Sequence, residues 1–177
     1  MGVGLLAMAH GAASVTGLDK YAPVVDRKFD QAVLRALREG LETEEQRHRF
    51  DAAWTGETYG EAVQHITNCP LEKAHRRLPQ AHYDVVWSRS VLEYLKNVPR
   101  AFSVLQDLMK PGGLMVHKVD VRDDGLFSAH GHHPLLFLTL RRGVWSGMTS
   151  HTYRPNQWLT DFRRLLRDQG WVGGAFP

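Results

Sequence analysis

An acidic residue at the end of a short β-rich segment is the first residue of this chain suited to ligand chemistry. Asp19 follows the sequence SVTGL and comes fifteen residues after Gly4, which with Gly2 opens a helix-forming segment. In doubly wound α/β folds, a glycine turn entering a helix holds phosphates or carboxylates, and an acid ending the next strand accepts hydrogen bonds from a vicinal diol. Two glycines and one acid are weak evidence alone, because an ordinary turn and an exposed aspartate explain them equally well.

Three histidines close together, His130, His132 and His133, raise the question of a metal site completed by Asp120 or Asp124. The pattern His-x-His-His before a proline lacks the second ligand cluster that structural zinc sites show. We therefore expect no bound metal, and we interpret residues 125–155 as an excursion over the substrate side of the domain.

The elements that must position these residues alternate between helix and strand. Asp26 is a suitable helix cap, Thr43 and Gln46 form a capping-box pattern, and Pro111-Gly112-Gly113 is expected to end a helix. The alternation predicts an α/β fold with a mostly parallel sheet, in one domain over residues 1–177. Helices are expected at 4–10, 26–39, 43–54, 99–110 and 156–169, and strands at 14–18, 63–68, 83–87, 114–121 and from 171.

The amino-acid composition bears on whether the protein binds nucleic acid or a membrane. The 177 residues include 43% hydrophobic and 23% charged residues, and the net charge of +3 comes from basic residues scattered among acids. This is typical of a solvated surface, so nucleic acid is not expected as the main partner. The longest apolar run, residues 134–138, is far too short for a membrane span, and the single cysteine excludes an internal disulfide. We expect a cytoplasmic protein without membrane association.

Four segments of the sequence together resemble class I S-adenosylmethionine-dependent methyltransferases, which have a Rossmann-like, doubly wound fold. YDVVWSRSVLEYLKN is similar to their fourth strand and the following helix, and LQDLMKPGGLMVHKVDVRD to the next helix, the Pro-Gly-Gly turn and the fifth strand. The closest similarity is to a bacterial branch with VLEH after strand four and H-x-x-D-x-R-D in strand five. The other two segments are GVGLLAMAHGAASVTGLD, after the first strand, and NQWLTDFRRLLRDQGW, before the sixth.

The resemblance implies a cofactor site for S-adenosylmethionine. Gly2 and Gly4 would form the tail of the glycine loop beside the methionine part, and Asp19 would bind the ribose. Leu71 and Glu72, in NCPLE, would lie against the adenine. Ser88, at the end of strand four, would line the channel near the sulfonium.

The implied reaction is methyl transfer to an unidentified small-molecule or glycan-like acceptor. Oxygen and nitrogen nucleophiles often need a general base, for which His117 and Asp120 at the end of strand five are the candidates. Residues three apart in a strand point to opposite faces, so at most one of them faces the substrate. A nicotinamide-dependent dehydrogenase shares the glycine-and-acid pattern, but the full Gly-x-Gly-x-x-Gly is not present, and Pro-Gly-Gly fits methyltransferases better.

The chain departs from the family pattern at both ends. The first strand and the opening glycines of the loop would precede Met1, and GGAFP does not supply the last hairpin. We expect a chain truncated at the N-terminus, and in part at the C-terminus, that binds S-adenosylmethionine weakly or not at all. Strands 14–18 and 83–87 would keep unpaired edges that favour self-association. The alternative function is a non-catalytic remnant, or a subunit that completes its sheet with another chain.

Overall fold

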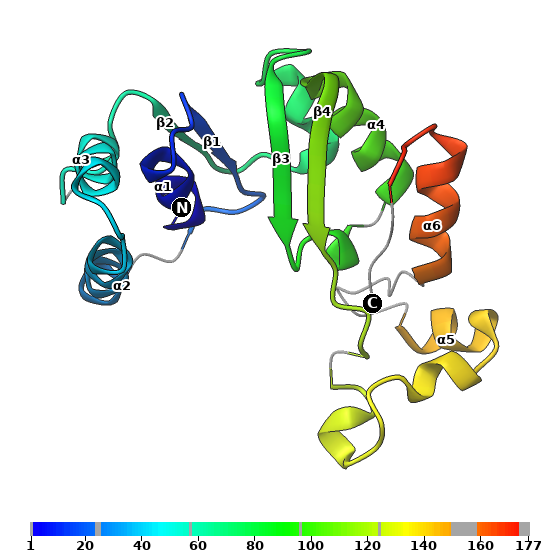
Figure 1. Ribbon diagram of the computed structural model, residues 1–177. Coiled ribbons are helices and arrows are strands. Elements are labelled where there is room, and N and C mark those ends of the chain that lie inside the picture. The colour runs from blue at the N-terminus through cyan, green and yellow to red at the C-terminus, as the bar shows by residue number, and fades with distance from the viewer. Residues whose placement is uncertain are drawn as a thin grey trace. The chain divides into compact units, whose positions relative to one another are not determined.

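The computed structural model describes residues 2–23, 26–56, 58–95, 97–123, 125–149 and 159–173. The chain divides into two compact units, Met1–Ala74 and His75–Pro177, and each is described by itself. Figure 1 shows the elements of both units along the chain. The single domain expected from the sequence stays a prediction.

Two well-capped helices follow the first strand of unit 1. The Asp26 side chain accepts a hydrogen bond from the Phe29 amide at the start of α2 (Arg27–Glu39). Thr43 and Gln46 form the complete capping box at the start of α3 (Glu44–Ala53). Both caps satisfy backbone amides that have no partner inside the helix, which confirms these two sequence predictions.

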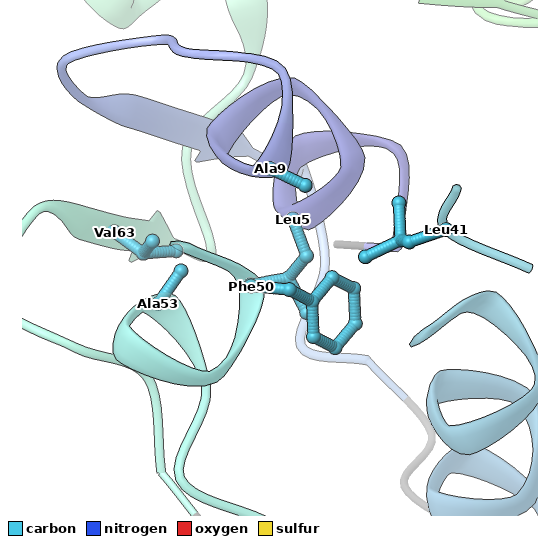
Figure 2. Packing of buried hydrophobic residues seen from close by; sticks show 6 residues of the cluster. All are labelled: Leu5, Ala9, Leu41, Phe50, Ala53 and Val63. Atoms are coloured by element: carbon cyan, nitrogen blue, oxygen red, sulfur yellow. The ribbon is translucent and has the colours of Figure 1, made fainter. Parts of the chain in front are cut away.

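The first helix, α1 (Gly2–Ala9), supplies the centre of the core of unit 1. Its sequence is apolar on every side, so it is suited to burial between other elements. Leu5 is fully buried and packs with Phe50 from α3 (Figure 2). The buried core cluster consists of Leu5, Ala9, Leu41, Phe50, Ala53 and Val63.

The sheet of unit 1 has two parallel strands, β1 (Val15–Leu18) and β2 (Val63–Ile66), paired in register from Val15 with Val63 to Leu18 with Ile66. Both strands therefore end at the same edge. A short 3-10 helix, η1 (Leu71–Arg76), follows β2. The carboxyl edge of this sheet is where a parallel α/β fold places its ligands.

Unit 2 contains a β-α-β element made of β3 (Tyr83–Arg89), α4 (Val98–Leu108) and β4 (Met109–Lys118). The two strands are parallel, and Ser88 pairs with His117 near their carboxyl ends. Asn97 caps α4 by accepting from the Arg100 amide, and α4 lies along the β3–β4 pair (Figure 1).

The sequence predicted that Pro111-Gly112-Gly113 ends a helix, and this prediction is wrong. Helix α4 already ends at Leu108, and the three residues lie inside β4 where the register shifts between Tyr83 and Val85. Gly112 has a φ of 80°, which side-chain-bearing residues rarely adopt. The motif therefore forms an irregularity at the start of β4.

The two faces of the β3–β4 pair differ. One face packs on helices, because Met115 contacts a cluster that joins Leu92 and Phe102 to Phe162 of α6 (Leu159–Asp168). The other face carries exposed apolar side chains. These are Val85, Trp87, Leu114 and Val116.

The segment after β4 is more ordered than its sequence indicates. It contains the 3-10 helices η3 (Ser128–His130) and η4 (Leu136–Thr139) and the helix α5 (Arg142–Thr149), which we did not predict. Trp145 is buried and stacks on Phe127 and Phe137, so aromatic packing holds this segment. Residues 150–155 of the predicted excursion lie outside the described residues.

The last helix ends as predicted, at Gly170 with a left-handed φ of 74°. Its expected start at residue 156 lies outside the described residues, and the strand expected from Trp171 is not formed over 171–173. In the described parts of the chain, the sheet consists of two separate parallel pairs, β1–β2 and β3–β4. This agrees with a Rossmann-like α/β fold, whereas one continuous doubly wound sheet is not seen among those residues.

Candidate functional site

Asp19 lies directly beyond the carboxyl end of β1, as the sequence predicted. Its amide donates to the Ile66 carbonyl at 2.9 Å, and its carbonyl accepts from the Cys69 amide at 3.0 Å. The backbone of Asp19 is therefore tied on both sides to β2 and the residues that follow it. The side chain is 59% exposed, and its contact within the described part of the chain is made by Oδ2, so Oδ1 is open to a ligand there.

The contact on Oδ2 comes from His65 of β2, whose Nε2 lies 2.7 Å away. An ionised carboxylate only accepts hydrogen bonds, so Nε2 is the donor. The sequence analysis did not identify His65. The signal was a histidine within the strand expected at residues 63–68, and its contact with Asp19 becomes visible only once β1 and β2 are in register.

The turn after β2 connects the backbone contact with Asp19 to the residues expected at the adenine. Asn68 adopts a left-handed φ of 55°, a conformation that asparagine tolerates better than most residues. This turn lets the Cys69 amide reach Asp19, and Pro70 then leads into η1. Leu71 and Glu72, the first two residues of η1, are both half-buried.

Gly2 and Gly4 lie in the first turn of α1 and do not form a loop, in contrast to what the resemblance implied. A Cβ added to Gly2 would lie 3.0 Å from the Leu37 side chain of α2, and Gly4 is buried. Both glycines are therefore used in close packing of α1. Their proposed contact with the cofactor stays a prediction.

Ser88 and His117 form a pair near the carboxyl ends of β3 and β4. Ser88 Oγ and His117 Nδ1 lie 2.8 Å apart, and the imidazole packs edge-on against Phe102 of α4 at 5.8 Å between ring centroids. His117 Nε2 is buried and has no hydrogen-bond partner in the described part of the chain. The ring therefore lies on the face that helices cover.

Burial lowers the pKa of His117 to about 4, so the imidazole is neutral near pH 7. A base with so low a pKa is a weak proton acceptor at neutral pH, since general bases work best with a pKa near the working pH. The geometry supports a role for His117 in holding the Ser88 hydroxyl more than a role as general base.

Asp120, the other candidate base, is held by Arg122. The guanidinium contacts both carboxylate oxygens, with Nε 2.9 Å from Oδ1 and Nη2 2.6 Å from Oδ2. Both side chains lie just beyond β4, and such a bidentate pair stabilises the ionised carboxylate. Asp120 is thus oriented by a neighbour two residues away, and its role in proton transfer stays a prediction.

Glu93 is a second residue whose importance the sequence analysis missed. It lies in the 3-10 turn η2 (Leu92–Tyr94) that follows β3, and it is only 2% exposed. Neither carboxylate oxygen has a hydrogen-bond partner among the described residues. Buried carboxylates are normally partnered, so this one is costly for the fold. Its sequence signal was an acid between apolar neighbours in the VLEY segment.

The three histidines after β4 lie among the described residues, whereas Asp124, one of the two carboxylates considered with them, does not. Over the described residues, no group of three or more histidine, cysteine or acidic side chains is arranged to hold a metal ion. His133 Nδ1 instead accepts a hydrogen bond from the Leu135 amide. Across the same residues, no helix is long and apolar enough to cross a membrane.

Comparison with known proteins gives one clear result. Neither the curated proteins nor the solved structures contain a match to this chain. A family model described as a methyltransferase domain matches residues 2–172 and so includes both units. The chain therefore belongs to the methyltransferase domain family.

Proposed function

We propose that this protein uses S-adenosylmethionine to methylate a small-molecule or glycan-like acceptor. The family match supports methyl transfer, and the observation that carries the cofactor proposal is the exposed, oriented carboxylate of Asp19 at the carboxyl edge of a parallel sheet. That is the place and the chemistry for the ribose of a nucleoside cofactor.

The hydrogen-bond acceptors and side chains of unit 1 fit this cofactor. A carboxylate has about four lone-pair sites, and the contact with His65 uses one of those on Asp19. The remaining sites are enough for the two hydroxyls of a ribose. Leu71 and Glu72 would flank the adenine. The hydrogen bond from the Cys69 amide to the Asp19 carbonyl fixes the chain just before η1, in which both residues lie. Gly2 and Gly4 would serve the methionine part.

The cofactor, when bound, supplies an electrophilic methyl group, and the protein must position the acceptor and exclude water. In unit 2, His117 orients the Ser88 hydroxyl, and the family resemblance gives Ser88 the role of lining the channel near the sulfonium. For Asp120 to accept the proton of the acceptor nucleophile, its ion pair with Arg122 would first have to open, because this pair stabilises the ionised carboxylate and weakens it as a base.

Binding of S-adenosylhomocysteine, followed by ligand-observed NMR, tests this proposal. We expect weak but measurable binding that S-adenosylmethionine displaces. Asp19→Asn and Asp19→Ala should weaken binding by about 1–3 kcal/mol, because charge-assisted hydrogen bonds to the ribose are lost. Asp30→Asn is the matched control, because Asp30 is an exposed aspartate in the first turn of α2. No binding, or equal binding by all four proteins, would contradict the proposal.

A non-catalytic subunit is the second candidate function, and the open sheet edges favour it. In the described residues, β1 pairs only with β2 and β3 only with β4. A strand from another chain would add to such an edge through backbone hydrogen bonds. This candidate predicts a molar mass that rises with concentration in light scattering, together with no cofactor binding. A monomer at all concentrations would exclude self-association of this kind.

A further inference from the structure

We propose that His65 is a positioning residue, which orients the Asp19 carboxylate for the ribose of the cofactor. This inference rests on the function proposed above and assigns to His65 a task within the same site. His65 touches Asp19 and acts through it.

The register of β1 and β2 places the two side chains on one face. Gly17 pairs directly with His65, and Asp19 lies two residues beyond Gly17. Paired residues point to the same face of a sheet, and so do residues two apart in one strand. Gly17 has no side chain, so the residue paired with His65 places no Cβ beside the imidazole. The resulting contact between Nε2 and Oδ2 is 2.7 Å long.

Hydrogen bonds fix the backbone of Asp19, so only rotation about its side-chain torsions can still change the direction of the carboxylate. Hydrogen bonds with Ile66 and Cys69 hold the amide and the carbonyl. A free, exposed carboxylate would have to be ordered on binding, at a cost in entropy. The contact with His65 orders it beforehand, because the His65 side chain is only 18% exposed and is itself held by the sheet.

The burial of the two partners also indicates which one meets the ligand. Asp19 keeps 59% of its side chain exposed, whereas His65 is mostly covered. The pair is therefore built with an inner donor and an outer acceptor. An isolated surface ion pair of two long, mobile side chains has no such arrangement, and it contributes little.

The experiment is a double-mutant cycle on the full chain. The affinity for S-adenosylhomocysteine, and for its analogue without the ribose 2′-hydroxyl, is measured for the wild type, His65→Ala, Asp19→Ala and the double variant. We expect His65→Ala to weaken binding of the parent ligand about 3- to 10-fold and the analogue much less. In the Asp19→Ala background, His65→Ala should have no further effect.

Two further variants separate positioning from a general effect on folding. His65→Gln keeps an amide N–H at the distance of Nε2 and should restore most of the affinity and of the preference for the 2′-hydroxyl. His48→Ala, an exposed histidine of α3, should bind as the wild type does. A purely structural role would lower the affinity for both ligands by the same factor.

The outcomes distinguish this inference from the function on which it rests. If the wild type binds neither ligand, the proposed function fails, and the inference fails with it. If the wild type binds and Asp19→Ala weakens binding, but His65→Ala leaves affinity and hydroxyl preference unchanged, only the inference is overturned. The same holds if the effects of the two alanine substitutions simply add.

Discussion

The buried imidazole of His117 should make the stability of this protein depend on pH between 7 and 4. Burial lowers the pKa of His117 from 6.5 to about 4 in the folded protein. Between these values the unfolded chain binds a proton that the folded chain does not, so stability falls as the pH falls. The full stabilisation is present above pH 6.5. The difference between the two pKa values corresponds to about 3 kcal/mol, since one pKa unit is worth about 1.4 kcal/mol.

Urea unfolding at a series of pH values, for the wild type and His117→Gln, measures this contribution. Glutamine does not titrate, so between pH 7 and pH 4 the wild type should lose about 3 kcal/mol more unfolding free energy than the variant. Carboxylates with a lowered pKa also lose stabilisation in acid, but they are common to both proteins and cancel. Equal pH dependence of the two proteins would refute the reasoning, because it would mean that the ring is solvated in the folded state.

Three further changes test other parts of the structure. Glu93→Leu should raise the free energy of unfolding by about 1–3 kcal/mol, because it removes a buried carboxylate without a partner in the described residues. The measurement is calorimetry, and a loss of stability would mean that the carboxylate is hydrogen-bonded in the folded protein. Asn68→Val should destabilise by about 1–3 kcal/mol in urea unfolding, since a β-branched residue is strained at a φ of 55°, whereas Asn68→Gly should not. Thr43→Ala should cost about 1 kcal/mol in the same assay through loss of the capping box, and a difference within error would contradict the assigned cap.

The helix caps and the strands near the site could be predicted because their signals are local. Asp26 and Thr43 cap the helices that their sequence patterns indicate, and Gly170 ends the last one. Each signal depends on a few neighbouring residues, so no knowledge of distant contacts is needed. The same holds for Asp19 at the end of β1.

Predictions from local sequence patterns were wrong for two segments, because tertiary packing determines the secondary structure there. Pro-Gly-Gly normally breaks a helix, but α4 ends at Leu108 because the chain enters the pairing with β3 from Met109. Helix α5 lacks a strong periodic pattern, and it forms where Trp145 stacks on Phe127 and Phe137. Tertiary contacts commonly override such weak local preferences.

The methyltransferase family, the alternation of helices and strands and the carboxylate of Asp19 could all be predicted from the amino-acid sequence. The contacts of the individual side chains depend on the folded structure. His65 lies 46 residues from Asp19, and the contact exists because parallel register sets the two side chains on one face. Likewise, the pKa of His117 is lowered because α4 covers the ring, and Glu93 has both oxygens buried without a partner in the described residues. Such properties arise from the burial and register of distant segments, which local sequence patterns do not encode.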